Sequence, residues 1–146
     1  MITQDEVHTL LNDVRVFFRR PYITAAGKYP TVDDICRLET NLFKYFLSKG
    51  INTVFVLYTD ALLKQNNEMT LCISFEDYAS FKLFEEKWGN FISDTSGFAK
   101  HTRKDNYGYF TIPLSITLCV NSLVSFGSLL EDELETAVIN NSFNKL

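Results

Sequence analysis

The stretch NTVFVLYT, residues 52–59, decides the fold class of this chain. It is a continuous run of β-branched and aromatic residues, and the stretch MTLCISF at 69–75 follows with apolar residues on alternate positions. Both runs are typical of β-strands, the first of a strand buried on both faces and the second of a half-buried one. Because the polar turn residues QNNE at 65–68 lie between the runs, we predict an antiparallel hairpin.

Two helices are expected ahead of this hairpin. Thr3 followed by Glu6 is a capping-box pattern, and apolar residues then recur on one face at helical spacing. Thr31 with Asp34 is a second capping signal, before another apolar stripe that ends near Gly50. The N-terminal third of the chain is therefore predicted to be helical.

The chain after the hairpin is expected to return to a helix and then to a strand. Ser74 with Asp77 is an N-cap signature, and the aromatic residues that follow it are spaced as in a helix. The segment 107–120 is strand-like but contains Pro113, which cannot donate a hydrogen bond to a neighbouring strand. We therefore predict an edge strand, a bulged strand, or two strands that meet at the proline.

A short last helix is predicted from Ser128, with Glu131 as its capping partner. The acidic run EDELE at 131–135 would then lie near the helix start, where negative charge favours the helix dipole. The order α-α-β-β-α-β-(β)-α predicts an α+β fold, with a small, mostly antiparallel sheet of three or four strands packed with about four helices. The length predicts a single globular domain over residues 1–146.

Composition narrows the classes of function. The net charge of −4 argues against a generic nucleic-acid binder. Cys36, Cys72 and Cys119 are too widely spaced for a disulfide framework or a metal knuckle, and the two histidines, His8 and His101, are far apart. No nucleotide-binding glycine motif occurs, so we expect no metal and no cofactor.

The chain shows no signal peptide and no apolar run of membrane-spanning length, so we expect a cytoplasmic protein without a membrane partner. Residues with AT-rich codons are abundant, which favours a phage or bacterial origin. Neither expectation identifies a partner, and the oligomeric state is left open.

The segment GFAKHTRKDNYGYF, residues 97–110, holds the candidate functional residues. We expect 97–106 to be a solvent-exposed basic loop and 107–110 to begin a strand. The candidate binding residues are three cations and two stacking aromatics: Lys100, Arg103, Lys104, Tyr107 and Tyr109. The cations would form a larger patch if the fold brought Arg19, Arg20 and Lys28 beside them.

Three functions remain after these considerations. The leading interpretation is a small non-enzymatic protein-binding domain, such as an inhibitor, an immunity factor or a phage-type modulator of a host protein, that acts through a pre-formed surface. The alternative is a nucleic-acid-binding protein or nuclease that uses the 100–104 segment. The second alternative is a hydrolase that depends on His101, with Asp105 converging on it in the loop.

Overall fold

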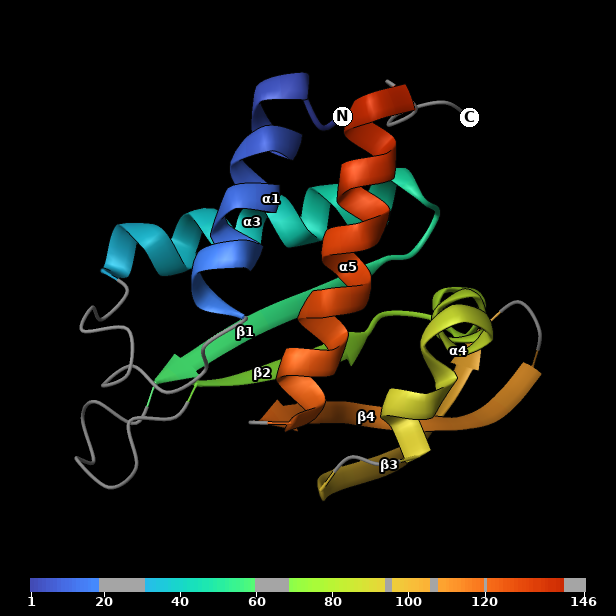
Figure 1. Cartoon of the computed structure of the whole chain (residues 1–146). Helices are drawn as coiled ribbons and strands as arrows, with labels where there is room; N and C mark the ends of the chain where they lie inside the picture. Colours follow the sequence, from blue (N-terminus) through green and yellow to red (C-terminus); the bar gives the residue numbers. More distant parts are fainter. Residues whose placement is uncertain (19–30, 60–68, 94–95, 106–107, 120, 141–146) are drawn as a thin grey trace.

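The chain folds into helices packed on an antiparallel sheet. The structure is a computed structural model that describes residues 1–18, 31–59, 69–93, 96–105, 108–119 and 121–140. The helices are α1 (Gln4–Phe17), α3 (Val32–Ser48), α4 (Tyr78–Ser93) and α5 (Asn121–Asn140), and the strands are β1 (Thr53–Thr59), β2 (Met69–Phe75), β3 (Ser96–Asp105) and β4 (Gly108–Cys119) (Figure 1). The predicted α+β class is confirmed.

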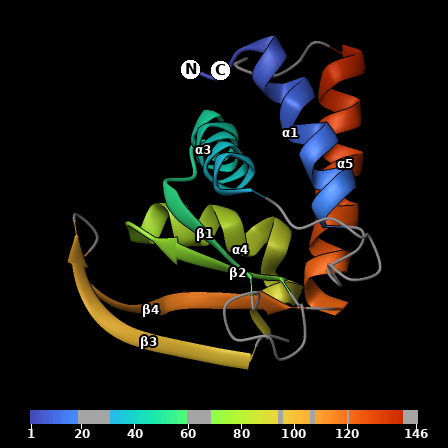
Figure 2. The same cartoon turned by 90° about the vertical axis from the view of Figure 1, so that its left-hand side faces the viewer.

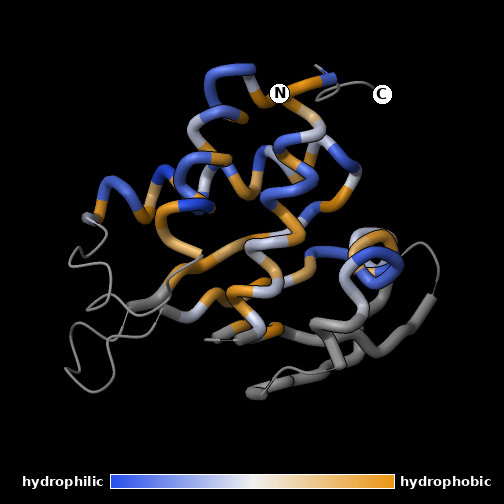
Figure 3. The backbone as a smooth tube through the Cα atoms, in the orientation of Figure 1, coloured by the Kyte–Doolittle hydropathy of each residue, from blue (hydrophilic) through white to orange (hydrophobic). Residues whose placement is uncertain are grey.

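The four described strands form one sheet in the order β1-β2-β4-β3. The predicted antiparallel pairing of β1 and β2 is confirmed, with Phe55 opposite Ile73, while the predicted turn at 65–68 lies outside the described residues. Every neighbouring pair of strands is antiparallel. Hydropathy is high along β1 and alternates along α1 and α3, as expected where strand and helices share a core (Figure 3).

The first strand is buried on one face only, so the expectation of burial on both faces is wrong. Phe55 and Leu57 are buried, whereas Val54 is 40% exposed and Val56 is half-buried. Phe55 faces the helices, where its ring packs on Phe46 of α3. The apolar run made the two faces of β1 indistinguishable in the sequence.

Phe46 lies at the centre of the aromatic core. Its ring centroid is 5.0 Å from that of Phe55 in β1 and 5.7 Å from that of Trp88 in α4. It also lies 6.1 Å from Phe84 in α4 and 6.4 Å from Phe126 in α5. One side chain of α3 thus joins the sheet to two other helices.

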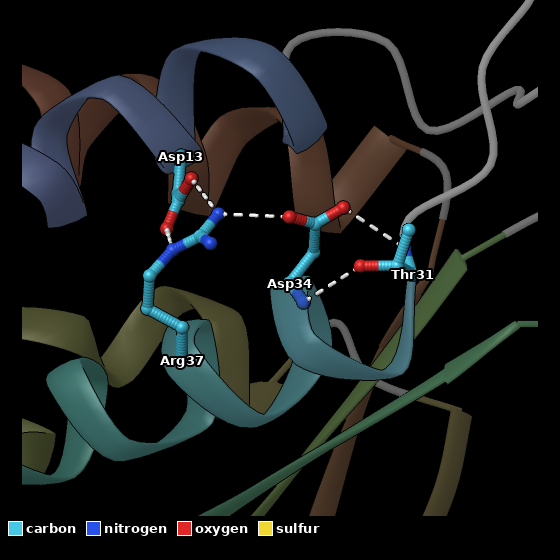
Figure 4. Close-up of polar contacts among 4 residues, drawn as sticks. All are labelled: Asp13, Thr31, Asp34 and Arg37. Atoms are coloured by element: carbon cyan, nitrogen blue, oxygen red, sulfur yellow. Dashed lines mark hydrogen bonds and ion pairs between the residues drawn. The ribbon is translucent and has the colours of Figure 1, made fainter.

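Both predicted capping boxes are confirmed. In α1, the backbone N–H of Thr3 donates to Glu6 Oε1 at 2.8 Å, and the backbone N–H of Glu6 donates to Thr3 Oγ1 at 3.1 Å. In α3, the same exchange joins Thr31 and Asp34 at 2.9 and 3.1 Å (Figure 4). Each box satisfies two backbone groups that a helix start leaves unpaired.

The start of α4 is capped by a different residue from the one predicted. Ser74 lies inside β2, and the cap is Asp77, whose Oδ1 accepts a hydrogen bond from the backbone N–H of Ser80 at 2.7 Å. Ser80 also accepts a 2.7 Å hydrogen bond from the backbone N–H of Asn52 through its own hydroxyl. The first turn of α4 is thereby tied to the residue before β1.

The last helix is longer than predicted, and the placement of EDELE at its start is wrong. Helix α5 begins at Asn121, so residues 131–135 lie in its second half. Helix α5 continues through Gly127, which lies against the end of α1: a Cβ added there would be 2.5 Å from Cβ of Phe18, the residue after α1. No described helix is both long enough and apolar enough to cross a membrane.

Candidate functional site

The basic segment is part of a strand, so the prediction of an exposed loop over 97–106 is wrong for the residues described. Ser96–Asp105 form β3, which pairs with β4 at the edge of the sheet. This strand contains the basic cluster Lys100, His101, Arg103 and Lys104. A run of charges is compatible with an edge strand, where it discourages pairing with other chains. The charge pattern therefore did not distinguish a loop from an edge.

The β3–β4 hairpin extends past the rest of the sheet (Figure 2). Only Ser115–Cys119 of β4 pair with β2, whereas Gly108–Pro113 pair with β3 alone. We call residues 100–105 and 108–113 the β3–β4 arm. A two-stranded ribbon gains little stability by itself, so this arm is a feature that calls for a functional explanation.

Pro113 lies at an irregularity in the arm. Lys100 is paired with Pro113 but Ala99 is paired with Ser115, so β4 contains one extra residue at Leu114. Of the three arrangements predicted for this segment, the bulged strand is the one observed. The bulge lies where β4 passes from the part flanked by β2 to the part flanked by β3 alone.

Four of the five predicted binding residues lie on the arm. Lys104 is opposite Tyr109 in the register. Because alternate residues of a strand share a face, Lys100, Lys104 and Tyr109 occupy positions on the same face of the ribbon. Arg103 is opposite Phe110, at a position on the other face. Tyr107, the fifth predicted binding residue, lies outside the described residues. So do the three cations of the larger patch: Arg19, Arg20 and Lys28.

His101 and Asp105 do not converge as they would in a loop. Both lie in β3, four positions apart, and an extended strand separates such residues by about 13 Å along its axis. A histidine and the carboxylate that orients it must be within hydrogen-bond reach. The geometry of β3 therefore removes Asp105 as the partner of His101.

Metal ligation has no support among the described residues, which contain no group of three His, Cys, Asp or Glu side chains arranged to hold an ion. His8 is exposed on α1. Cys36 is exposed on α3, and Cys72 is half-buried in β2.

A second candidate site, absent from the sequence predictions, is a hollow of about 420 Å³ between α3, α4 and α5. We call it the three-helix hollow. Its lining includes two aromatic or apolar residues and four charged ones: Tyr45, Leu129, Lys49, Lys87, Asp132 and Glu133. The lining residues are up to 92 positions apart in the chain, from 45 to 137, and no local sequence pattern connects them.

The floor of the three-helix hollow is a chain of polar contacts centred on Glu133. The hydroxyl of Tyr45 donates to Glu133 Oε1 at 2.8 Å, and Nζ of Lys87 lies 2.8 Å from Glu133 Oε2. Nζ of Lys49 lies 5.4 Å from the centroid of the Tyr45 ring. Burial, with the adjacent charge of Glu133 and the hydrogen bond to it, raises the pKa of Tyr45 well above its usual value.

We expect this shift to make stability fall at high pH. An unfolded tyrosine loses its proton above about pH 10, whereas folded Tyr45 keeps it, so the unfolded state is favoured as the pH rises further. The free energy of unfolding of the wild type should decline relative to Tyr45→Phe by up to about 1.4 kcal/mol per pH unit above pH 10. Urea unfolding of both proteins from pH 9 to pH 11 measures the difference.

The other tyrosines cancel in this comparison because both proteins contain them. Lys49 and Lys87, which face Tyr45 and Glu133, are also common to both. Parallel pH dependence of the two proteins would contradict the assignment of the shift to Tyr45.

Two arginine-centred sets of ion pairs join α1 to its neighbouring helices. Arg37 of α3 donates to both carboxylate oxygens of buried Asp13 of α1, at 2.8 and 2.9 Å, and to Asp34 at 3.0 Å (Figure 4). Arg15 of α1 donates once to Glu131 and once to Glu135 of α5. These contacts occupy the charged groups with one another and tie α1 to both neighbouring helices.

Two surfaces of the described residues thus combine charge with a defined shape: the β3–β4 arm and the three-helix hollow. Comparison of the chain with family models, with curated proteins and with solved structures finds no match.

Proposed function

We propose that this chain is a non-enzymatic protein-binding domain and that the β3–β4 arm is its binding surface. The observation that carries the proposal is the arm itself, a basic two-stranded ribbon that continues beyond β2. An inhibitor, an immunity factor or a phage-type modulator of a host protein would act in this way, through a surface formed before the partner arrives.

The two edges of the sheet differ in a way that favours β3 as the binding edge. In β1, the backbone N–H of Leu57 donates to Oε2 of Glu39 at 2.8 Å, so a side chain of α3 occupies a donor that a neighbouring strand would use. In β3, which is ten residues long, no described element takes the position beside the outer edge. An exposed strand edge offers backbone donors and acceptors to an incoming strand.

Pro113 indicates which backbone groups of β3 face outward. A proline has no N–H to donate, so its pairing with Lys100 favours a non-hydrogen-bonded pair. In such a pair, the N–H and C=O groups of each residue point away from the residue opposite. By alternation, the N–H groups of Lys100, Thr102 and Lys104 then face the open edge. A partner strand would bind along these three residues.

Charge indicates the chemistry of the partner. The arm carries three cations against one carboxylate, Asp105, while the whole chain carries −4. A partner with an extended acidic segment would add backbone hydrogen bonds along β3 and ion pairs to Lys100, Arg103 and Lys104. Opposite charges also accelerate the encounter and select against other partners.

The test is a pull-down from a lysate of the organism of origin, with the tagged wild type and two variants. The triple variant Lys100→Ala, Arg103→Ala, Lys104→Ala removes the charges, and Thr102→Pro removes one outward N–H and blocks strand addition. We expect a stoichiometric protein with the wild type, and a loss of at least about tenfold in its recovery with each variant. Lys82→Ala, which removes one exposed lysine of α4, serves as the control for loss of positive charge outside the arm.

The proposal fails if the wild type recovers no stoichiometric protein or if both variants capture as much as the wild type. Circular dichroism and thermal unfolding of each variant establish that the sheet is retained. The hydrogen bonds between β3 and β4 are not altered by a proline whose nitrogen faces the open edge, so Thr102→Pro distinguishes lost binding from lost folding.

Nucleic-acid binding is the second candidate, and the ribbon shape favours it, because a two-stranded β-ribbon can enter the major groove of DNA. It predicts binding to a labelled duplex that weakens with salt, with a log–log slope of about −3 for three phosphate contacts. Fluorescence anisotropy at low salt provides the measurement. Absence of binding there, together with a captured protein partner, would decide for the leading proposal.

A further inference from the structure

We infer that the three-helix hollow is a binding site for a small zwitterion with an apolar tail, of the α-amino acid type. This site lies on the helices and does not depend on the proposed function of the arm. The volume of about 420 Å³ is within the range of small-molecule sites, roughly 300–1,000 Å³.

The floor of the hollow is already neutral. Tyr45 donates to one carboxylate oxygen of Glu133, and the ammonium group of Lys87 lies beside the other oxygen. Glu133 keeps only 18% of its side chain exposed. Because the negative charge of Glu133 is balanced by Lys87, neither group leaves a net charge for a ligand to satisfy.

Two opposite charges at the rim have no ion-pair partner among the described residues. Lys49, at the C-terminal end of α3, and Asp132, on α5, both line the hollow and both are exposed. Within the described part of the chain, no ion pair joins either of them to another side chain. The hollow therefore presents one cation and one anion, from different helices, around a neutral floor.

A zwitterion matches this arrangement. Its carboxylate would pair with Lys49 and its ammonium group with Asp132, and its tail would lie against Leu129 and Ala137, which also line the hollow. A singly charged molecule would satisfy one rim charge and leave the other in water. Specificity of this kind arises because a few placed polar groups fix the orientation of an otherwise apolar ligand.

The experiment is a titration of the full chain followed by two-dimensional NMR, with three probes of similar shape. Leucine carries both charges, leucinamide lacks the carboxylate, and 4-methylpentanoate lacks the ammonium group. We expect leucine to shift the amide resonances of Ala137 and Leu129 in a saturable way, with a Kd of the order of millimolar. Each singly charged probe should bind about tenfold more weakly.

Two variants assign the contacts. Lys49→Met should abolish the preference for leucine over leucinamide, and Asp132→Asn should abolish the preference for leucine over 4-methylpentanoate. Both side chains are exposed, so neither change disturbs the core. Lys82→Met, on the part of α4 outside the lining, is the control and should leave both preferences unchanged.

Shifts that remain linear up to about 50 mM leucine overturn the inference, since they show no site. Equal binding of all three probes also overturns it, because the rim charges would then play no part. A pull-down result for the β3–β4 arm has no bearing on either outcome, so the two proposals succeed or fail separately.

Discussion

Phe46→Ala is expected to lower the free energy of unfolding by about 3–5 kcal/mol. The side chain is 2% exposed and its ring lies within 6.4 Å, centroid to centroid, of aromatic rings in β1, α4 and α5. Removing it loses the transfer energy of the ring, leaves a cavity, and removes several aromatic pairs worth about 0.5–1.5 kcal/mol each. Since domains of this size are stable by about 5–15 kcal/mol, the variant should be marginal at room temperature.

Urea or thermal unfolding, followed by circular dichroism, measures the effect. The matched control is Leu47→Ala, the next residue of α3, whose side chain is 46% exposed and which should change stability by no more than about 0.5 kcal/mol. Comparable losses in the two variants would mean that Phe46 is not the centre of the core.

Gly127→Ala is expected to destabilise the protein, although alanine is a better helix former than glycine. The added Cβ would lie 2.5 Å from Cβ of Phe18, closer than side-chain atoms approach, so α1 and α5 would have to separate. Overpacking of this kind costs about 1–3 kcal/mol, and the separation would also disturb the ion pairs of Arg15 with Glu131 and Glu135. This cost should exceed the gain of about 1 kcal/mol from helix propensity.

The protein supplies its own control in Gly89 of α4. A Cβ at Gly89 would meet Cγ of Glu85 at 3.7 Å, an ordinary contact, so Gly89→Ala should stabilise the protein by about 0.5–1 kcal/mol. Opposite signs for the two glycines, measured by chemical denaturation, are the expected result. Stabilisation by both substitutions would show that α1 and α5 do not cross as closely as described.

Features that depend on residues close in sequence were predictable. The capping boxes at Thr3 and Thr31 join residues three positions apart, and the structure confirms both. The antiparallel pairing of β1 and β2 follows from two apolar runs separated by a polar stretch of sequence. The wrong N-cap predicted for α4 also concerns neighbouring residues. The pattern assigned Ser74 as the cap and Asp77 as its partner, but Asp77 is itself a good N-cap residue and is the one observed.

Features that depend on distant residues were not predictable. The partner of Arg15 is Glu131, 116 positions away, so the acidic run looked like a helix start rather than the side of α5 that faces α1. The close approach of Gly127 to Phe18, the residue after α1, also joins distant parts of the chain. The three-helix hollow was missed for the same reason.

The β3–β4 arm was predicted only in part from the sequence. Its residues were identified as candidates from their charge and aromatic content, but their placement in a loop was wrong. Whether a basic run pairs with a neighbour depends on a complementary strand elsewhere, here Gly108–Pro113. The register, not the composition, places Lys104 beside Tyr109.

The difference between the two sheet edges has a consequence for self-association. At the β1 edge, Glu39 already holds the N–H of Leu57, so among the described strands β3 is the edge open along its length. Two copies that joined edge to edge through β3 in both would form a two-fold symmetric pair. Such a contact uses both β3 edges and ends at a pair. Growth beyond it would need the β1 edge, where Glu39 already holds the N–H of Leu57.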